Sequence, residues 1–387
     1  MTGLYIHVPL CISRCRYCDF YKMTPDEWDN VALFLHCLDV ELGRLPADFA
    51  PDTVFIGGGT PTALEPADYA KMLESIRRHI NLSNVVEFSS EANPGTLTPE
   101  KLAAMRDGGI NRVSIGVQSF NDKALRLLGR IHESQEAIDG YYMLREAGFD
   151  NVNIDLIQSI PGMTPADILA DARMLADLGP EHVSYYNLIY EPGTPMTHDR
   201  DAGRISPPGD DEEADNYFAV KALLEEAGYG HYEISNFAKN RTRREAGSER
   251  RQRSDNRCLH NVLYWQGGEY FGCGPSAHSH WRGRRFGNIP DLQAYCDRLQ
   301  RDERPFDEVE TLSFEEKARE TLVMWLRMTE GVDLARFESL TGHHADALCG
   351  DAIKSMEEEG LLQRGENRLA LSPEALFVCN AVFSELV

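Results

Sequence analysis

Short runs of apolar and β-branched residues alternate with longer amphipathic segments through the first half of the chain. Six of the short runs have the length and composition of buried strands: 4–8, 53–57, 86–91, 112–118, 152–157 and 183–189. The segments between them carry apolar residues at helical spacing, and several end in glycine, as helices often do: 27–45, 66–80, 99–109, 133–149 and 165–179. Strands that alternate with helices at this spacing predict βαβ units and a parallel sheet.

The spacing allows two architectures for this α/β region, a partial barrel of six βα units or a doubly wound sheet. In both, the side chains that follow the carboxyl ends of the strands gather at one edge of the sheet. The residues at those positions are polar: GGGTPT at 57–62, Glu91, Gln118 and Asp155. We therefore expect a ligand site along that edge.

The pattern changes after about residue 200. The stretch 239–257 holds eight basic and three acidic residues without apolar periodicity, which predicts a solvated loop. From residue 311 onward, helical segments lead into a turn at 365–367 between two short strand-like runs, which predicts a winged-helix-like region. We divide the chain into a core domain, a linking segment and a C-terminal domain, at 1–235, 236–310 and 311–387.

Composition narrows the class of protein. The chain has 387 residues, 42% of them hydrophobic and 26% charged, as is usual for a soluble globular protein. Its net charge of -23 argues against nucleic-acid binding, because phosphates would be repelled over most of the surface. The sequence has no long apolar run and no secretory signal, so we expect a cytoplasmic protein with at most peripheral membrane association. The nine cysteines are then not expected to form a disulfide framework, and those that cluster are expected to be metal ligands or catalytic thiols.

The strongest chemical signal is the run Cys11-Ile-Ser-Arg-Cys15-Arg-Tyr-Cys18. Three thiolates within eight residues can converge on one metal centre when the loop wraps around it. A cubane iron–sulfur cluster normally takes four protein ligands, so three leave one iron open to bind a small molecule directly. The alternatives are a zinc site completed by His7 and three unrelated core cysteines.

The C-x3-C-x2-C loop, with an aromatic residue before its last cysteine, resembles the signature of the radical S-adenosylmethionine superfamily. Further motifs are similar to the porphyrin-related branch of that superfamily, which contains oxygen-independent coproporphyrinogen III dehydrogenases and the HemW heme chaperones. They follow in order along nearly the whole chain: FIGGGTPT, SSEANPGTLT, RVSIGVQSFNDKALRLLGRIH, VNIDLIQSIPGMT, YYNLIYEPGTPM, HYEISNFA, HNVLYW and GCGPSAHS. The resemblance implies a partial (β/α)6 barrel, a C-terminal, mainly helical, winged-helix-like domain, a [4Fe–4S] cluster and S-adenosylmethionine.

The resemblance also implies roles for individual residues. Cys11, Cys15 and Cys18 would ligate the cluster, whose open iron would be chelated by S-adenosylmethionine. The positions that would surround this cofactor are Tyr5 and Tyr17 beside the cluster, Gly58, Gly59 and Thr60 at its methionine end, and Glu91, Gln118, Arg130 and Asp155 around its sugar and amino-acid portions.

Two features discriminate within this branch. Coproporphyrinogen dehydrogenases carry a further cysteine two residues after the third, where this chain has Phe20. The run 260–265, HNVLYW, resembles the HNxxYW motif of the HemW chaperones, which makes His260 the candidate heme ligand. A packed core histidine is the alternative for His260, and the rival ligands nearby are Cys258, His278 and His280.

These features together favour a heme chaperone that delivers heme to an acceptor hemoprotein, expected to be a respiratory one. The second function class is a radical enzyme that acts on a tetrapyrrole, as a dehydrogenase or a methyltransferase. The missing fourth cysteine argues against dehydrogenase activity. The sequence allows a homodimer and does not identify the acceptor.

Overall fold

A computed structural model describes residues 1–27, 30–239 and 256–386. Its strands are β1 (Thr2–Val8), β2 (Thr53–Gly58), β3 (Glu87–Ala92), β4 (Arg112–Gln118), β5 (Val152–Gln158), β6 (His182–Asn187), β7 (Tyr229–Glu233), β8 (Asn236–Lys239), β9 (Glu269–Cys273), β10 (His278–Trp281), β11 (Arg284–Asn288), β12 (Phe306–Thr311), β13 (Val332–Asp333), β14 (Leu362–Arg364) and β15 (Arg368–Leu371). Its α-helices are α1 (Val31–Leu42), α2 (Pro66–His79), α3 (Pro99–Asp107), α4 (Asp122–Leu128), α5 (Ser134–Glu146), α6 (Pro165–Leu178), α7 (Pro195–Asp201), α8 (Asp210–Glu226), α9 (Leu259–Trp265), α10 (Leu292–Gln300), α11 (Phe314–Trp325), α12 (Leu334–Thr341), α13 (Ala345–Glu358) and α14 (Cys379–Ser384). Short 3-10 helices are η1 (Pro25–Glu27), η2 (Pro61–Ala63), η3 (Leu82–Asn84), η4 (Pro94–Thr96) and η5 (Glu374–Leu376).

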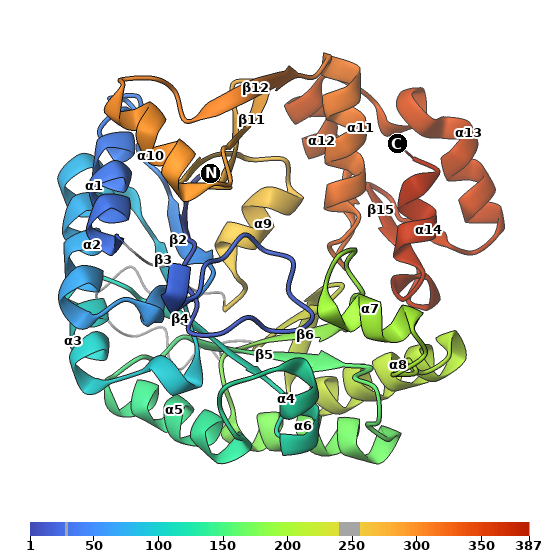
Figure 1. Ribbon diagram of the computed structural model, residues 1–387. Coiled ribbons are helices and arrows are strands. Elements are labelled where there is room, and N and C mark those ends of the chain that lie inside the picture. Colours follow the sequence, from blue (N-terminus) through green and yellow to red (C-terminus); the bar gives the residue numbers. More distant parts are fainter. Residues whose placement is uncertain (28–29, 240–255, 387) are drawn as a thin grey trace.

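Strands β1 to β6 are the six predicted strands, and each pairs in parallel with the next. Their apolar side chains are buried, as in β1, where Leu4, Ile6 and Val8 are inaccessible to solvent. Helices α1 to α6 connect these strands and cover the outside of the curved sheet in Figure 1. Strands β1 and β6 do not pair with each other, so the sheet remains an open barrel. The predicted partial barrel is confirmed, and the doubly wound alternative is not found.

Further strands extend the barrel sheet beyond both of its edges, in the order β12-β11-β10-β9-β1-β2-β3-β4-β5-β6-β8-β7. Strand β9 lies parallel to β1, and β10 to β12 follow as an antiparallel series. At the other edge, β8 pairs antiparallel with β6. Part of the predicted linking segment, 236–310, therefore continues the main sheet.

The C-terminal region has its own hydrophobic core, centred on Trp325, Phe337 and Ile353. Helix α11 begins with a capping box in which Ser313 and Glu316 bond each other's backbone N–H groups. A small antiparallel sheet, β13-β15-β14, completes this region, with the predicted turn at 365–367 joining β14 to β15. The helical C-terminal region with a small hairpin agrees with the prediction. In the part of the chain that the structure describes, no helix is both long and apolar enough to span a membrane.

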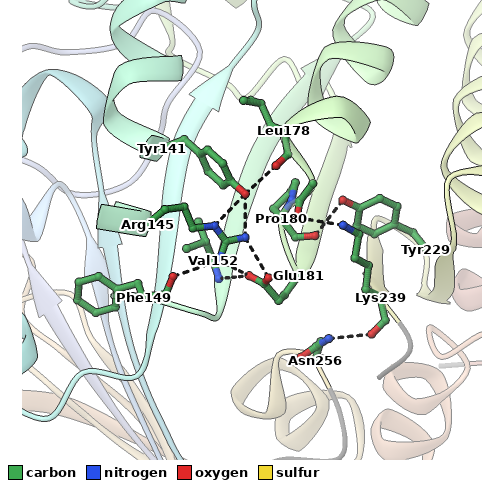
Figure 2. A network of polar contacts seen from close by, with 11 residues as sticks. Tyr141, Arg145, Phe149, Val152, Leu178, Pro180, Glu181, Tyr229, Lys239 and Asn256 are labelled. Atoms are coloured by element: carbon green, nitrogen blue, oxygen red, sulfur yellow. Dashed lines mark hydrogen bonds and ion pairs between the residues drawn. The ribbon is translucent and has the colours of Figure 1, made fainter. Parts of the chain in front are cut away.

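A polar network joins the amino ends of β5 and β6 (Figure 2). Glu181, just before β6, accepts a hydrogen bond of 3.0 Å from the backbone N–H of Val152 and pairs with Arg145 at 2.8 Å. The guanidinium of Arg145 also donates to the hydroxyl of Tyr141. The network therefore fixes the barrel end opposite the carboxyl edge of the sheet.

Residues 240–255, which make up most of the predicted basic loop, lie outside the described residues. The two residues that flank them, Lys239 and Asn256, lie at the same end of the barrel as this network. The side-chain amide of Asn256 donates a 2.8 Å hydrogen bond to the carbonyl of Lys239, and the Lys239 ammonium donates to the carbonyl of Gly179. The two flanks of the segment are thus bonded directly to each other (Figure 2).

Candidate functional site

A cavity of about 620 Å³ opens at the carboxyl edge of the barrel strands. All thirteen residues that the sequence and the resemblance single out as cofactor or metal ligands line it: Tyr5, Cys11, Cys15, Tyr17, Cys18, Gly58, Gly59, Thr60, Glu91, Gln118, Arg130, Asp155 and His260. They come from β1 to β5, from the loops that follow those strands, and from α9. Their individual roles stay predictions, but the fold brings every one of them to the same cavity.

The cysteine loop follows β1 and is tied to the barrel at several points. The backbone N–H of Cys11 donates to the carbonyl of Met23, and that of Arg16 donates to the carbonyl of Leu128, both at 2.9 Å. Near the thiols, Cys11 Sγ lies 3.6 Å from Thr60 Oγ1, and Cys15 Sγ accepts a 3.2 Å hydrogen bond from Arg130. The loop therefore places the sulfur of Cys11 beside the glycine turn and that of Cys15 beside the guanidinium of Arg130.

The surroundings of the thiols and of His7 bear on the zinc alternative. Burial raises the pKa of Cys11 to about 11 and also raises the pKa of Cys18, so each thiol keeps its proton until a cation replaces it. In the described ranges, no three His, Cys, Asp or Glu side chains, the three loop cysteines included, are grouped closely enough to hold one metal ion. The ring of His7 is hydrogen-bonded to Tyr5 and to the carbonyl of Tyr21. The zinc alternative with His7 is therefore not supported.

The glycine turn packs directly against the cysteine loop. A Cβ on Gly58, whose φ is +104°, would lie 2.5 Å from the ring of His7. A Cβ on Gly59 would lie 2.7 Å from the carbonyl oxygen of Leu10. The backbone N–H of Thr60 donates to that same oxygen at 2.6 Å. Side chains are absent here because the turn and the loop approach each other too closely for any to fit.

Two partly buried carboxyl groups, those of Glu91 and Asp155, line the cavity. Burial raises the pKa of Glu91 to about 8, and the nearby Asp155 adds to the rise. Glu91 accepts a 3.1 Å hydrogen bond from the backbone N–H of Gly58. Burial also raises the pKa of Asp155, although bonds from Asn153 at 2.7 Å and Ser114 at 3.0 Å oppose that rise. Such carboxyls can bind ammonium, sulfonium or hydroxyl groups of a ligand.

Gln118 ends β4, the strand between those of Glu91 and Asp155, and Arg130 is bonded to the same strand. Arg130 is partly buried and donates a 2.6 Å hydrogen bond to the carbonyl of Gly116, while its buried Nε has no hydrogen-bond partner among the described residues. Gln118 ends β4 with a φ of +71°, a conformation that a side chain rarely adopts. The carboxylate of Asp171 holds the following turn by accepting from the N–H of Phe120 at 3.1 Å. The strained backbone at Gln118 is supported from outside the cavity.

Helix α9 carries the HNVLYW run and packs against β1, β2 and α11, so it lies between the barrel and the C-terminal region (Figure 1). His260 is only 1% exposed. Its Nδ1 lies 2.8 Å from Thr53 Oγ1, and its Nε2 lies 2.7 Å from the hydroxyl of Tyr264. Burial lowers the pKa of His260 to about 4, so its ring is neutral at pH 7. Ligation of iron by this histidine requires that one of the two hydrogen bonds break.

Sequence reasoning missed two buried charges behind α9. Glu87 on β3 accepts hydrogen bonds of 3.0 Å from the backbone N–H groups of Leu259 and His260. Arg112, the first residue of β4, lines the cavity although it is only 2% exposed. Both residues sit within strand-like runs, where nothing in the pattern distinguishes an inward-facing charge from a solvated one.

Hydrophobic side chains are exposed along the cavity. Five of them line it: Ile12, Phe20, Ile131, Tyr186 and Ile189. Phe20 occupies the position where the dehydrogenase pattern has its fourth cysteine, and its side chain is 63% exposed. At this position the chain therefore presents an apolar surface instead of a reactive thiol.

Residues 5–175 match the family model "Radical SAM superfamily", and residues 312–378 match "HemN C-terminal domain". The solved structure of coproporphyrinogen III oxidase (HemN) from Escherichia coli superposes with a TM-score of 0.82 at 22% identity, covering 100% of this chain and 89% of that one. The open barrel and the cysteine loop thus define a radical S-adenosylmethionine protein, a class that implies a [4Fe–4S] cluster and S-adenosylmethionine.

Curated relatives narrow this class. The heme chaperone HemW of Bacillus subtilis is 34% identical over 387 residues, which cover 99% of this chain and 98% of that protein. The heme chaperone HemW of Lactococcus lactis is 32% identical over 390 residues, covering 100% of this chain and 97% of that one. The chain belongs to the HemW family.

Proposed function

We propose that the protein is a heme chaperone, which binds heme and transfers it to an acceptor hemoprotein. One observation carries the proposal: α9, with the HNVLYW run, forms a wall of the cavity that gathers all the predicted cofactor residues. Relatives with the name heme chaperone match the chain from end to end. Phe20 in place of a fourth cysteine supports the same function.

In this proposal Cys11, Cys15 and Cys18 would hold the [4Fe–4S] cluster, and an exchangeable S-adenosylmethionine would bind beside them. The bound pair supplies redox chemistry. The chain orients the cofactor: Glu91 and Asp155 receive its cationic and hydroxyl groups, while the glycine turn allows backbone atoms to approach it. The other predicted contacts are Tyr5, Tyr17, Thr60, Gln118 and Arg130.

Further parts of the proposal concern the location of the protein, its acceptor, its domains and its heme ligand. We place the protein in the cytoplasm, with at most peripheral membrane contact, and expect a respiratory hemoprotein as the acceptor. The division at 235 and 310, a homodimeric state and the role of His260 as heme ligand also stay predictions. Since both ring nitrogens of His260 are hydrogen-bonded, direct ligation would require the ring to release Thr53 or Tyr264.

Heme transfer is the test of this function. Purified full-length protein is titrated with heme while the Soret band is followed, and the loaded protein is then mixed with an apo-hemoprotein. We expect saturable binding and passage of heme to the acceptor. Absence of saturable binding by the wild-type protein would refute the chaperone function.

A second candidate is a radical enzyme that acts on a tetrapyrrole, and the complete set of predicted cofactor residues in the cavity favours keeping it. The discriminating assay supplies the anaerobically reconstituted protein with S-adenosylmethionine, dithionite and coproporphyrinogen III. We expect no protoporphyrinogen, since Phe20 replaces the fourth cysteine. Substantial product would replace the chaperone with a dehydrogenase.

A further inference from the structure

A chain of hydrogen bonds runs through the barrel interior, from the start of α9 to the carboxylate of Asp155. Its three connecting side chains come from neighbouring strands: Tyr232 on β7, His182 at the start of β6, and Asn153 on β5. All three are buried, and His182 is inaccessible to solvent. Asn153 and Asp155 line the main cavity. The chain therefore connects the helix that carries the HNVLYW run to one of the predicted cofactor contacts.

Four hydrogen bonds make up this chain. The backbone N–H of Cys258, the N-cap of α9, donates to the hydroxyl of Tyr232 at 3.2 Å. That hydroxyl lies 2.7 Å from Nε2 of His182. Nδ1 of the same ring lies 2.5 Å from Oδ1 of Asn153. Nδ2 of Asn153 then donates to Oδ1 of Asp155 at 2.7 Å.

The two ends of the chain set the direction of every bond in it. A backbone N–H only donates, and an ionised carboxylate only accepts. Asn153 therefore turns its amide nitrogen toward Asp155, and its remaining oxygen requires the hydrogen of His182 to be on Nδ1. In the neutral ring the lone pair is then on Nε2, where it accepts from Tyr232. All donors point toward Asp155, and hydrogen bonds aligned in this way strengthen one another.

Asn153 supports both oxygens of Asp155. It donates to Oδ1 directly, and it also donates at 2.7 Å to the hydroxyl of Ser114, which donates in turn to Oδ2 at 3.0 Å. Each carboxylate oxygen has two lone-pair sites, so one site on each oxygen is left for a ligand. Two acceptor sites on one carboxylate match two neighbouring hydroxyl groups, as a ribose has.

The same contacts favour the charged form of Asp155. Burial raises the pKa of this carboxyl, while the hydrogen bonds from Asn153 and Ser114 and the positive charge of Arg112 oppose that rise. Buried polar side chains need partners wherever they lie, but they need not end in a carboxylate on a cavity wall. The direction and the end point of the chain thus indicate a role toward a ligand.

We propose that Asn153 and His182 are positioning residues, which hold Asp155 as the acceptor for the two sugar hydroxyls of S-adenosylmethionine. This inference rests on the proposed function and deepens it, since Asp155 is one of the predicted cofactor contacts. His182 is not part of the cavity lining and acts through Asn153, whose amide it holds in one orientation. Tyr232 extends the support to the N-cap of α9.

The affinities for S-adenosylmethionine and for its dideoxyribose analogue, which lacks both sugar hydroxyls, test the proposal. Both are measured by equilibrium dialysis on the full-length protein after anaerobic reconstitution. The wild type should bind the analogue about tenfold or more weakly, because hydrogen bonds to a carboxylate are lost. In Asn153→Leu and His182→Leu the affinity for S-adenosylmethionine should fall about tenfold, while that for the analogue changes little. A general loss of structure would instead weaken both ligands equally.

Three further variants serve as rescue and control. His182→Asn keeps an N–H donor near the position of Nδ1 and should retain most of the preference for S-adenosylmethionine. Tyr232→Phe removes one hydroxyl from the chain and should reduce the preference by less than His182→Leu does. Tyr229→Phe is the matched control, because Tyr229 is also a buried tyrosine of β7 but donates to the carbonyl of Pro180, outside the chain. It should bind both ligands as the wild type does.

The outcomes separate this inference from the proposed function. Equal binding of both ligands by the wild type overturns the assignment of Asp155 to the sugar hydroxyls. An unchanged preference in folded Asn153→Leu overturns the positioning role, as does a loss in His182→Asn equal to that in His182→Leu. Each of these results leaves the heme titration unaffected, and absence of heme binding by the wild type removes the chaperone function itself. Circular dichroism checks that each variant has folded, and Tyr232→Phe takes the place of His182→Leu if that variant does not fold.

Discussion

Helix α9 depends on a carboxylate from another part of the chain. Its N-cap residue, Cys258, provides no side-chain cap, so the first backbone N–H groups need another acceptor. Glu87, which is fully buried on β3, accepts from Leu259 and His260 at 3.0 Å each. Burial alone would lower the pKa of the neighbouring Arg112. The nearby Cys258 and Glu87 raise that pKa by more than burial lowers it, so the net shift is upward. Glu87 therefore accepts hydrogen bonds from the first turn of α9 and also stabilises the charge of the buried Arg112.

The structure gives the size of the effect of removing this carboxylate. A hydrogen bond to a charged group contributes about 1.5–3 kcal/mol, and a favourable charge at a helix terminus about 0.3–1 kcal/mol. Breaking a buried charge pair costs about 3–5 kcal/mol in total, which includes these contributions. We expect Glu87→Ala to lower the free energy of unfolding by about 4 kcal/mol. Glu87→Gln keeps one acceptor oxygen and should cost about 2 kcal/mol.

Urea unfolding followed by circular dichroism measures both losses, with an unchanged m-value as the condition for comparing them. Glu74→Ala is the control, because Glu74 forms only an exposed ion pair with Arg78, and such pairs contribute about 0–1 kcal/mol. Both Glu87 variants should also weaken heme binding, since α9 lines the cavity of the candidate site. A loss below about 1 kcal/mol in Glu87→Ala would refute the role assigned to this carboxylate.

Three further predictions concern other parts of the molecule. Cys15→Ser should lower the iron content and the cluster absorbance after anaerobic reconstitution, whereas Cys379→Ser in the C-terminal region should not; equal iron content in both would contradict the ligand set. Because the pKa of Glu91 is raised to about 8, the free protein holds this proton at pH 7. S-adenosylmethionine, a cation, should displace the proton, so its affinity should rise with pH up to about 8. Calorimetry in two buffers would detect the proton release, and Glu91→Gln should abolish it. Glu181→Ala should lower the free energy of unfolding by about 2 kcal/mol, through loss of the Arg145 pair and one backbone acceptor; an unchanged urea midpoint would show that the network in Figure 2 is not stabilising.

The parallel part of the sheet could be predicted because its signal is local. In β1 and β5 apolar and β-branched residues are concentrated in runs of strand length, and each run is followed by a helix of adequate length. Strands β9 and β11 gave no such signal. They are short and carry exposed or partly exposed charged residues such as Glu269 and Arg284. Strand β9 also pairs with β1, which lies far from it in the sequence. A periodic pattern contains no information about such a distant partner.

In the candidate site, too, some residues could be predicted from the sequence and others could not. The cysteines and the glycine turn are contiguous motifs, and the resemblance supplied Glu91, Arg130 and Asp155 one position at a time. His260 was found through its motif, but its burial and its bonds to Thr53 and Tyr264 could not be predicted. Those features arise from tertiary packing. Glu87 was invisible for the same reason.

The hydrogen bond between Asn256 and Lys239 has a consequence for the evolution and engineering of the chain. It joins the two points between which segment 240–255 is inserted, so contacts outside the segment set the distance between its ends. Each doubling of the length of a loop with fixed ends costs only about 0.6 kcal/mol. Insertions and deletions can therefore accumulate there at little cost in stability. The same position suits a fluorescent label or an affinity tag, far from the carboxyl edge of the barrel.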